Sequence, residues 1–389
     1  MLKGAATIEE TGTAGGARPC GHVPLVLSIV GTRPEAIKMA PVADAIAERP
    51  DLRQLVLLTG QHRTLESHFA GHACLQLDLP DLGTLRFAGQ RDALRAAIAQ
   101  ALMTIGPDLV LVHGDTTSAL AGALAAHDLG IPIGHVEAGL RTHDFRQPWP
   151  EEGNRVAIDA IATLLFAPTQ ASAANLAREP AVSGAVHVTG NTGIDALHRA
   201  CQAPAAPPST GSRKRILVTC HRRENQGSSY AAVCAGLRRL ADELPVELLY
   251  LFHTNPHLRA AAQAELGGVP HISLHEPVPH TGAVALLRSS WALLTDSGGL
   301  QEDGAALGVP VIVLRELTER VEAPDNIVLA GSDPDAIVEQ VNRLLMSSTS
   351  YAAMSMPTLA FGDGKAAPRI AAAIADWFAS RRMQPPRAA

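Results

Sequence analysis

Residues 109–155 hold the pattern that most restricts how this chain can fold. Two apolar runs, Leu109–Val112 and Ile131–Val136, each end in a polar cluster, and an alanine-rich segment with a helical period lies between them. Uninterrupted apolar runs are typical of parallel strands buried on both faces of a sheet, and a helix usually makes the crossover between two such strands. We therefore expect a βαβ unit and a mainly parallel α/β sheet.

Acidic residues follow both of these expected strands. Asp115 comes after the first run, Glu137 after the second, and Glu151 after a proline-containing loop. Ligands of parallel sheets bind beyond the carboxyl ends of the strands, so we expect the three acidic positions to converge at one edge. Two interpretations of Asp115 stay open, because Asp is also a favoured N-cap for the helix expected to start near Thr116. Glu137 is harder to explain structurally, since it stands between an apolar strand and Gly139.

A glycine turn into a helix is a first candidate anion site. The strand expected at Val23–Val30 ends at Gly31, and Arg33 and Lys38 add positive charge at the start of the next helix. A helix start offers unpaired amides and the positive end of the helix dipole to an anion. The turn has neither the GxGxxG dinucleotide pattern nor a Walker lysine, which weakens hydride-transfer and ATPase interpretations.

A second candidate anion site lies in residues 295–310. Asp296 and Ser297 can cap a helix there, and Gly298 and Gly299 would let a ligand approach the amides of its first turn. A capped helix alone would not explain two adjacent glycines at its start.

Strands and helices alternate along the rest of the chain. After residue 155 we expect a helix at Val156–Ala162 and strands at Leu164–Ala167 and Ala185–Val188. A second series begins at Ile216 and repeats the same alternation, which predicts an α/β protein with two doubly wound, Rossmann-like domains.

Composition sets the expected boundaries between these domains. Residues 201–214 are rich in proline, alanine and serine without an apolar period, which indicates a linker. We therefore expect a flexible tail at 1–21, an N-terminal domain at 22–200 and a C-terminal domain at 215–365. The two would face each other across a cleft, where the ends of their strands meet.

Charge and composition exclude several classes of function. The 389-residue chain has a formal net charge of -6 and only 3% aromatic residues, which argues against a nucleic-acid surface. No apolar run approaches the roughly 18 residues of a membrane span. The five cysteines are scattered without CxxC spacing, which indicates neither disulfides nor zinc and favours the cytoplasm. His113 in the HGD string could suggest metal ligands, but no helical HxxxH or HExxH pattern accompanies it.

Several short strings along the chain form a specific set. They are GTRPEAIKMAP, TGQHR, HGDTT, HVEAGLRT, PWPEE followed by NR, GNTGIDAL, CHRRE, TDSGG followed by QE, and TER. Together they resemble the non-hydrolysing UDP-N-acetylglucosamine (UDP-GlcNAc) 2-epimerases. They occur in the family's order between about Leu25 and Phe361, and any one of them alone would be a weak signal.

The resemblance implies a glycosyltransferase-B-like fold with a C-terminal helix, in residues 366–389, that returns to the first domain. It also implies a homodimer that interconverts UDP-GlcNAc and the corresponding mannosamine derivative, UDP-ManNAc. The family reaction eliminates UDP to leave a 2-acetamidoglucal and then adds UDP back. It requires no redox cofactor and no metal.

Residue roles also follow from the resemblance. Its catalytic positions correspond to Asp115, Glu137, Glu151 and His221. Its substrate-binding positions correspond to Arg33, Lys38, Ser297, Gly298, Gly299, Asp303 and Arg320. In some bacterial members a loop with a Gln-His pair, here Gln61 and His62, binds a second UDP-GlcNAc as an activator.

The chain departs from the family at several positions. Asp303 replaces a glutamate that commonly holds the ribose, and Val321 replaces a proline after TER. Near the uracil, Val278 and Ala283 stand where a glutamine and an aromatic residue are frequent. Residues 81–90 differ from the loop that accompanies the Gln-His pair in activated members.

Three alternatives remain open on the sequence. The first is an enzyme that epimerises a modified UDP-2-acetamido sugar, and the second is either a hydrolysing epimerase that releases ManNAc and UDP or a transferase of the same fold. A sugar-nucleotide sensor without catalysis is the third, and the PWPEE string favours the non-hydrolysing branch.

Overall fold

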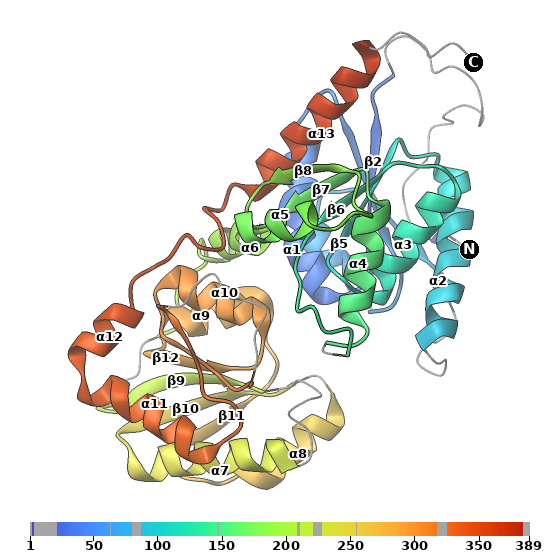
Figure 1. Ribbon diagram of the computed structural model, residues 1–389. Coiled ribbons are helices and arrows are strands. Elements are labelled where there is room, and N and C mark those ends of the chain that lie inside the picture. Colours follow the sequence, from blue (N-terminus) through green and yellow to red (C-terminus); the bar gives the residue numbers. More distant parts are fainter. Residues whose placement is uncertain are drawn as a thin grey trace. The chain divides into compact units, whose positions relative to one another are not determined.

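The computed structural model describes residues 2–3, 22–62, 64–79, 87–146, 148–207, 211–220, 228–253, 255–316 and 325–383. The chain divides into two compact units, each with its own sheet (Figure 1). The first unit comprises Met1–Ala196 and Gly362–Ala389, and the second comprises Leu197–Phe361. Among the described residues, no helix is both long and apolar enough to cross a membrane.

The sheet of the first unit has the strand order of a doubly wound fold. From edge to edge it runs β1-β4-β3-β2-β5-β6-β7-β8, and every neighbouring pair is parallel except β1 and β4. The order reverses between β2 and β5, which is where such sheets bind ligands. The strands are β1 (Leu2–Lys3), β2 (Leu25–Val30), β3 (Arg53–Leu58), β4 (Cys74–Leu77), β5 (Leu109–His113), β6 (Ile133–Val136), β7 (Leu164–Ala167) and β8 (Ala185–Val188).

Helices cover both faces of this sheet because its central strands are apolar on both sides. One face packs against α1 and α13, and the other against α2, α3, α4 and α5 (Figure 1). The elements are α1 (Arg33–Ala47), the 3-10 helix η1 (Glu66–Phe69), α2 (Phe87–Ile105), α3 (Thr117–Asp128), α4 (Glu151–Ile161), α5 (Gln170–Ala177), α6 (Thr192–Ala200) and α13 (Ala366–Met383).

The second unit repeats this architecture. Its parallel sheet has the order β11-β10-β9-β12-β13-β14, with the reversal between β9 and β12. Its strands are β9 (Lys214–Thr219), β10 (Val246–Leu251), β11 (Ile272–His275), β12 (Ala292–Thr295), β13 (Val311–Val313) and β14 (Ile327–Leu329). Its helices are α7 (Ser228–Glu243), α8 (Pro256–Leu266), α9 (His280–Arg288), α10 (Gly298–Leu307), α11 (Pro334–Met346) and α12 (Ser348–Met354). The prediction of two Rossmann-like α/β domains is confirmed.

The last helix, α13, belongs to the first unit. Its first amides, from Ala366 and Ala367, donate to the carboxylate of Asp195 at 3.1 and 2.9 Å. Ile370 and Ile374 are fully buried in the same core as Met39 of α1. Asp195 therefore satisfies the unpaired amides at the start of this helix and fixes where it docks.

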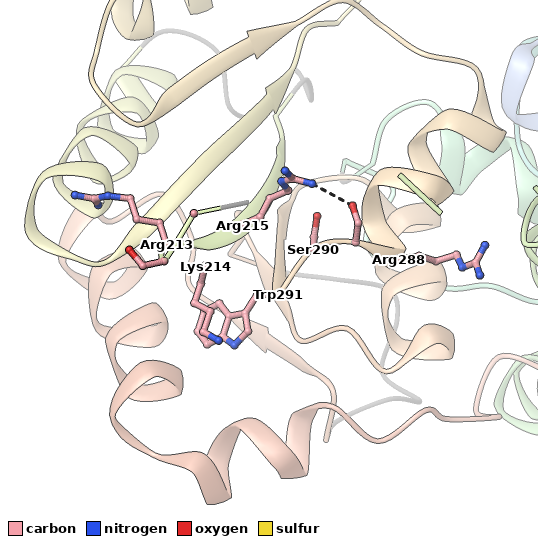
Figure 2. A pocket seen from close by; sticks show the side chains of 9 residues that line it. Arg213, Lys214, Arg215, Arg288, Ser290 and Trp291 are labelled. Atoms are coloured by element: carbon pink, nitrogen blue, oxygen red, sulfur yellow. Dashed lines mark hydrogen bonds between the residues drawn. The ribbon is translucent and has the colours of Figure 1, made fainter. Parts of the chain in front are cut away.

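A basic pocket of about 390 Å³ lies at the amino-terminal edge of the second sheet, which is opposite the edge where α10 begins (Figure 2). Figure 2 shows Arg213 and Arg288 extending away from each other. Arg288 donates to the carbonyls of Cys201 and Ala203, and Arg215 to that of Pro207. These arginines hold residues 201–207, in the expected linker, against the rest of the second unit.

Two local expectations need correction. Helix α4 begins at Glu151 rather than at Val156. Its first turn is polar and contains Gly153, so it lacks the apolar spacing from which a helix is predicted. Within the segment expected to be a flexible tail, Leu2 and Lys3 pair with β4. An edge strand presents unpaired backbone groups that such a segment can satisfy.

Candidate active site

Asp115 follows β5 and does not cap the next helix. Thr116 is the N-cap of α3, and its hydroxyl accepts from the amide of Ala119 at 3.0 Å. The Asp115 carboxylate instead accepts from Arg155 of α4 at 2.5 Å, and Asn154 donates to the Asp115 carbonyl at 2.7 Å. The capping interpretation is therefore wrong, and Asp115 ties α4 to the carboxyl end of β5.

Glu137 stands directly after β6 in a left-handed backbone conformation, with φ of 69°. Such a conformation is costly for a residue other than glycine and marks sites where the surroundings impose it. Its side chain is 11% exposed and pairs with the ammonium of Lys38, and its second carboxylate oxygen lies 3.8 Å from Nε2 of His113. The structure therefore brings Lys38 to a predicted catalytic carboxylate.

Glu151 is the first residue of α4, and its neighbour Glu152 has a different role. The Glu152 carboxylate is buried and accepts from the amides of Thr142 and His143, which fixes the preceding loop. Oε2 of Glu151 is also buried, yet it has no hydrogen-bond partner among the described residues. Buried carboxylate oxygens are normally satisfied, so Glu151 is the member of the pair that is available to a ligand.

The three acidic residues stand on segments that meet at one edge of the first sheet. Gly114 precedes Asp115, and a Cβ built on Gly114 would lie 3.3 Å from a carboxylate oxygen of Glu137. Glu151 lies one helical turn before Arg155, the partner of Asp115. This arrangement agrees with the convergence expected from the positions after β5 and β6.

His113, at the end of β5, is buried beside Glu137, which the sequence did not reveal. Burial lowers the pKa of His113 to about 4, with Glu137 acting in the opposite direction and Lys38 reinforcing the shift. The ring is therefore neutral at neutral pH, and its Nε2 is buried without a hydrogen-bond partner in the described part of the chain. No group of three or more potential metal ligands occurs in the ranges that the structure describes.

Glu35 is a further buried carboxyl that pattern analysis missed. It accepts from the amides of Gly31 and Thr32 at 2.7 and 2.6 Å and from the hydroxyl of Thr116. Burial raises the pKa of Glu35 to about 7, although these hydrogen bonds oppose the shift. The amides proposed to bind an anion at the start of α1 are therefore already occupied by a side chain of the same helix.

Gly31 is required here for space. A Cβ on Gly31 would come within 2.0 Å of the Ser118 hydroxyl and 2.7 Å of the Thr59 hydroxyl. Thr59 and Ser118 are themselves hydrogen-bonded at 2.9 Å. The turn therefore packs directly onto the start of α3, close to Asp115.

The Gln-His pair is attached to the same turn. The Ser118 hydroxyl donates to the side chain of Gln61 at 2.6 Å, and the amide of Arg33 donates to Nδ1 of His62 at 3.3 Å. Hydrogen bonds thus join His62 to Arg33, the first residue of α1, and Gln61 to Ser118 of α3. Whether they bind an activator stays a prediction.

The second unit holds the other candidate anion site at the carboxyl end of β12. Ser297 is the N-cap of α10, but its side chain makes no capping hydrogen bond. A Cβ on Gly299 would meet no atom of the described residues within 4 Å, so they leave the first turn open. Asp303 is buried in the same helix, with its carboxylate 3.3 Å from Nε2 of His280. His221 and Arg320 lie outside the described residues.

Comparison with known proteins identifies the family. A sequence model described as UDP-N-acetylglucosamine 2-epimerase matches residues 44–375. The chain belongs to this family. It is 40% identical over 368 residues to the Escherichia coli K12 protein named UDP-N-acetylglucosamine 2-epimerase, a match that covers 90% of this chain and 98% of that protein. Family membership makes it an isomerase.

Solved structures agree with this assignment. The UDP-GlcNAc 2-epimerase of Neisseria meningitidis, solved with UDP-GlcNAc bound, is 35% identical and matches with a TM-score of 0.85 over 90% of this chain and 100% of that chain. The glycosyltransferase SnogD of Streptomyces nogalater, at 17% identity, has a TM-score of 0.62 over 92% of this chain and 99% of that chain, and shares the fold alone. The glycosyltransferase-B-like architecture expected from the resemblance is thereby confirmed.

Proposed function

We propose that the protein interconverts UDP-GlcNAc and UDP-ManNAc without hydrolysis, by eliminating UDP and adding it back. Family membership supports the epimerisation, and the Neisseria relative binds UDP-GlcNAc. The observation that carries the proposal is the meeting of Asp115, Glu137 and Glu151 at one sheet edge, where an oxygen of Glu151 has no hydrogen-bond partner among the described residues.

The reaction explains why several carboxyl groups are needed. No carbonyl activates the hydrogen on carbon 2 of the sugar, so a base removes it only as the bond between carbon 1 and the UDP oxygen breaks. The electron pair of that bond leaves with UDP, and the proton stays on an enzyme group. Reversal from the other face requires a proton donor there, and UDP then attacks carbon 1. Two acid-base groups on opposite faces of the ring satisfy this sequence.

UDP would be held by the second unit in this proposal. The open first turn of α10, with Ser297, Gly298 and Gly299, offers amides and a positive dipole end to a diphosphate. Asp303 would contact the ribose, and His221 and Arg320 complete the proposed set. Lys38 would sit beside the sugar because it is paired with Glu137. The homodimer stays a prediction.

Exchange with heavy water tests the proposed reaction. Purified protein is incubated with UDP-GlcNAc in D₂O, and we expect NMR to show UDP-ManNAc and deuterium at carbon 2, because the abstracted proton exchanges before return. Release of free ManNAc and UDP would favour the hydrolysing alternative instead. If UDP-GlcNAc binds but neither exchanges nor reacts, the sensor alternative holds. A parallel panel of UDP-2-acetamido sugars altered at carbons 3 to 6 would identify a modified substrate.

Replacement of Gly299 by alanine tests the proposed UDP site. A methyl group there meets no atom of the described ranges within 4 Å, so stability should not fall, but it would obstruct a ligand at the helix start. We expect calorimetry to show UDP affinity reduced at least about tenfold, or about 1.4 kcal/mol. Gly153→Ala is a matched control in α4, where the nearest atom to the new Cβ is 3.9 Å away. Equal UDP affinity in both variants would place the diphosphate elsewhere.

A further inference from the structure

A cluster of charged side chains is buried behind the three acidic segments. His135 of β6 and Asp159 of α4 are both fully buried, with Nδ1 of the ring 2.6 Å from the carboxylate. Arg141 lies 2.7 Å from the other carboxylate oxygen and also binds Glu179 at 2.6 Å. None of these residues is among the predicted catalytic or binding positions.

The partners of His135 determine where its protons lie. Nε2 is 2.8 Å from the carbonyl of Gly114, which only accepts hydrogen bonds, so this nitrogen carries a proton. Although burial opposes ionisation, the pKa of Asp159 is lowered because His135 and Arg141 face its carboxylate. The Asp159 carboxylate faces Nδ1 at 2.6 Å, so the ring is held by an acceptor group on each side.

The cluster connects the three segments that carry the acidic residues. His135 binds the carbonyl of Gly114, which immediately precedes Asp115. Asp159 accepts from the amide of Gly139 at 3.2 Å, so the left-handed turn at Glu137 is held on both sides. Asp159 itself lies on α4, the helix that begins with Glu151.

Stability alone is a weak explanation for such a cluster. Replacing buried ion pairs with apolar residues of similar volume is often neutral or stabilising, because desolvation of the charges offsets their attraction. A left-handed residue such as Glu137 persists only where its surroundings fix it from several directions. Directional bonds from one imidazole and one carboxylate supply that geometry, which apolar packing would not.

We propose that Asp159 and His135 are positioning residues that hold Asp115, Glu137 and Glu151 in the arrangement needed for proton removal and return. The inference rests on the proposed epimerisation. Neither residue touches the substrate; both act through the backbone of the three segments. Loss of the cluster should therefore lower kcat and leave substrate binding largely unchanged.

The first test is Asp159→Asn, which keeps the shape but loses the charge and one of its two acceptor oxygens. We expect kcat for epimerisation to fall about 30-fold, with KM and the Kd for UDP within about threefold of wild type. Asp44→Asn is a matched control, because Asp44 forms a second Asp-His pair in the same unit, 2.6 Å from Nε2 of His72. Its kcat should stay within about twofold.

NMR of the ring nitrogens provides a readout that does not depend on turnover. In ¹⁵N-histidine-labelled protein, we expect His135 to show a proton shared between Nδ1 and the Asp159 carboxylate, and Asp159→Asn to shift the Nδ1 signal while Nε2 keeps its proton. If Asp159→Asn does not fold, His135→Asn replaces it, since Asp159 then keeps Arg141 and Gly139 as partners. Folded variants with kcat near wild type, or an Nδ1 signal of His135 that is the same with and without Asp159, would overturn the inference. An inactive wild type in which His135 is hydrogen-bonded at both nitrogens would instead contradict the proposed reaction alone.

Discussion

Replacing Glu137 with glutamine is expected to lower kcat by about 10³-fold, because loss of a positioned acid-base group typically removes a factor of that order. Glutamine has the same shape but does not take or give the proton. Lys38 could still donate to the amide oxygen, so the surrounding contacts should persist. UDP affinity should change little, since the proposed UDP site lies in the second unit. Turnover by NMR and UDP binding by calorimetry measure the two quantities separately.

Glu265→Gln is the control for this substitution. Glu265 also pairs with a cation, Arg238 at 2.6 Å, but on α8 of the second unit and with a partly exposed side chain. We expect its kcat to equal that of wild type. Should Glu137→Gln retain more than about a tenth of wild-type turnover, Glu137 would not be one of the proton-transferring groups.

The fold was predictable because buried parallel strands are continuous apolar runs. The strand expected at Leu164–Ala167 is β7, which is buried along its length and keeps its limits. The strand expected at Ala185–Val188 is β8, an edge strand that is mostly exposed although most of its residues are apolar. Helix α4 was harder, because its inner face is polar: Arg155 and Asp159 are buried there and bind Asp115 and His135. A spacing of four residues from Glu151 to Arg155 and on to Asp159 was the signal available in the sequence.

The two candidate anion sites show what local patterns leave undecided. Both combine glycine, a helix start and nearby polar residues. At α1, however, Glu35 turns back onto the amides of Gly31 and Thr32, whereas at α10 the described part of the chain leaves the position beyond Gly299 open. The roles of Glu35 and His113 depend on burial by segments distant in the sequence, which spacing does not reveal.

The pKa shifts of Glu35 and His113 have opposite signs, so their effects on the pH dependence of stability should largely cancel in the wild-type protein. The pKa of Glu35 rises from 4.5 to about 7 on folding. Its contribution to the free energy of unfolding is therefore full below pH 4.5 and is lost as the pH rises through 7. The pKa of His113 falls from 6.5 to about 4, so its contribution is present above pH 6.5 and is lost as the pH falls through 4. Each shift corresponds to about 3 kcal/mol.

Replacing one of the two groups at a time should reveal the pH dependence of stability that the other contributes. Glutamine at position 35 cannot ionise, so Glu35→Gln should gain stability relative to wild type by about 3 kcal/mol as the pH rises from 4.5 to 7. Asparagine at position 113 should instead gain a similar amount relative to wild type as the pH falls from 6.5 to 4. Urea unfolding of the three proteins across this range measures the differences, in which the titration of all other groups cancels. Curves that stay parallel to wild type would show that the two groups titrate normally and that the carboxyl edge of β5 admits water.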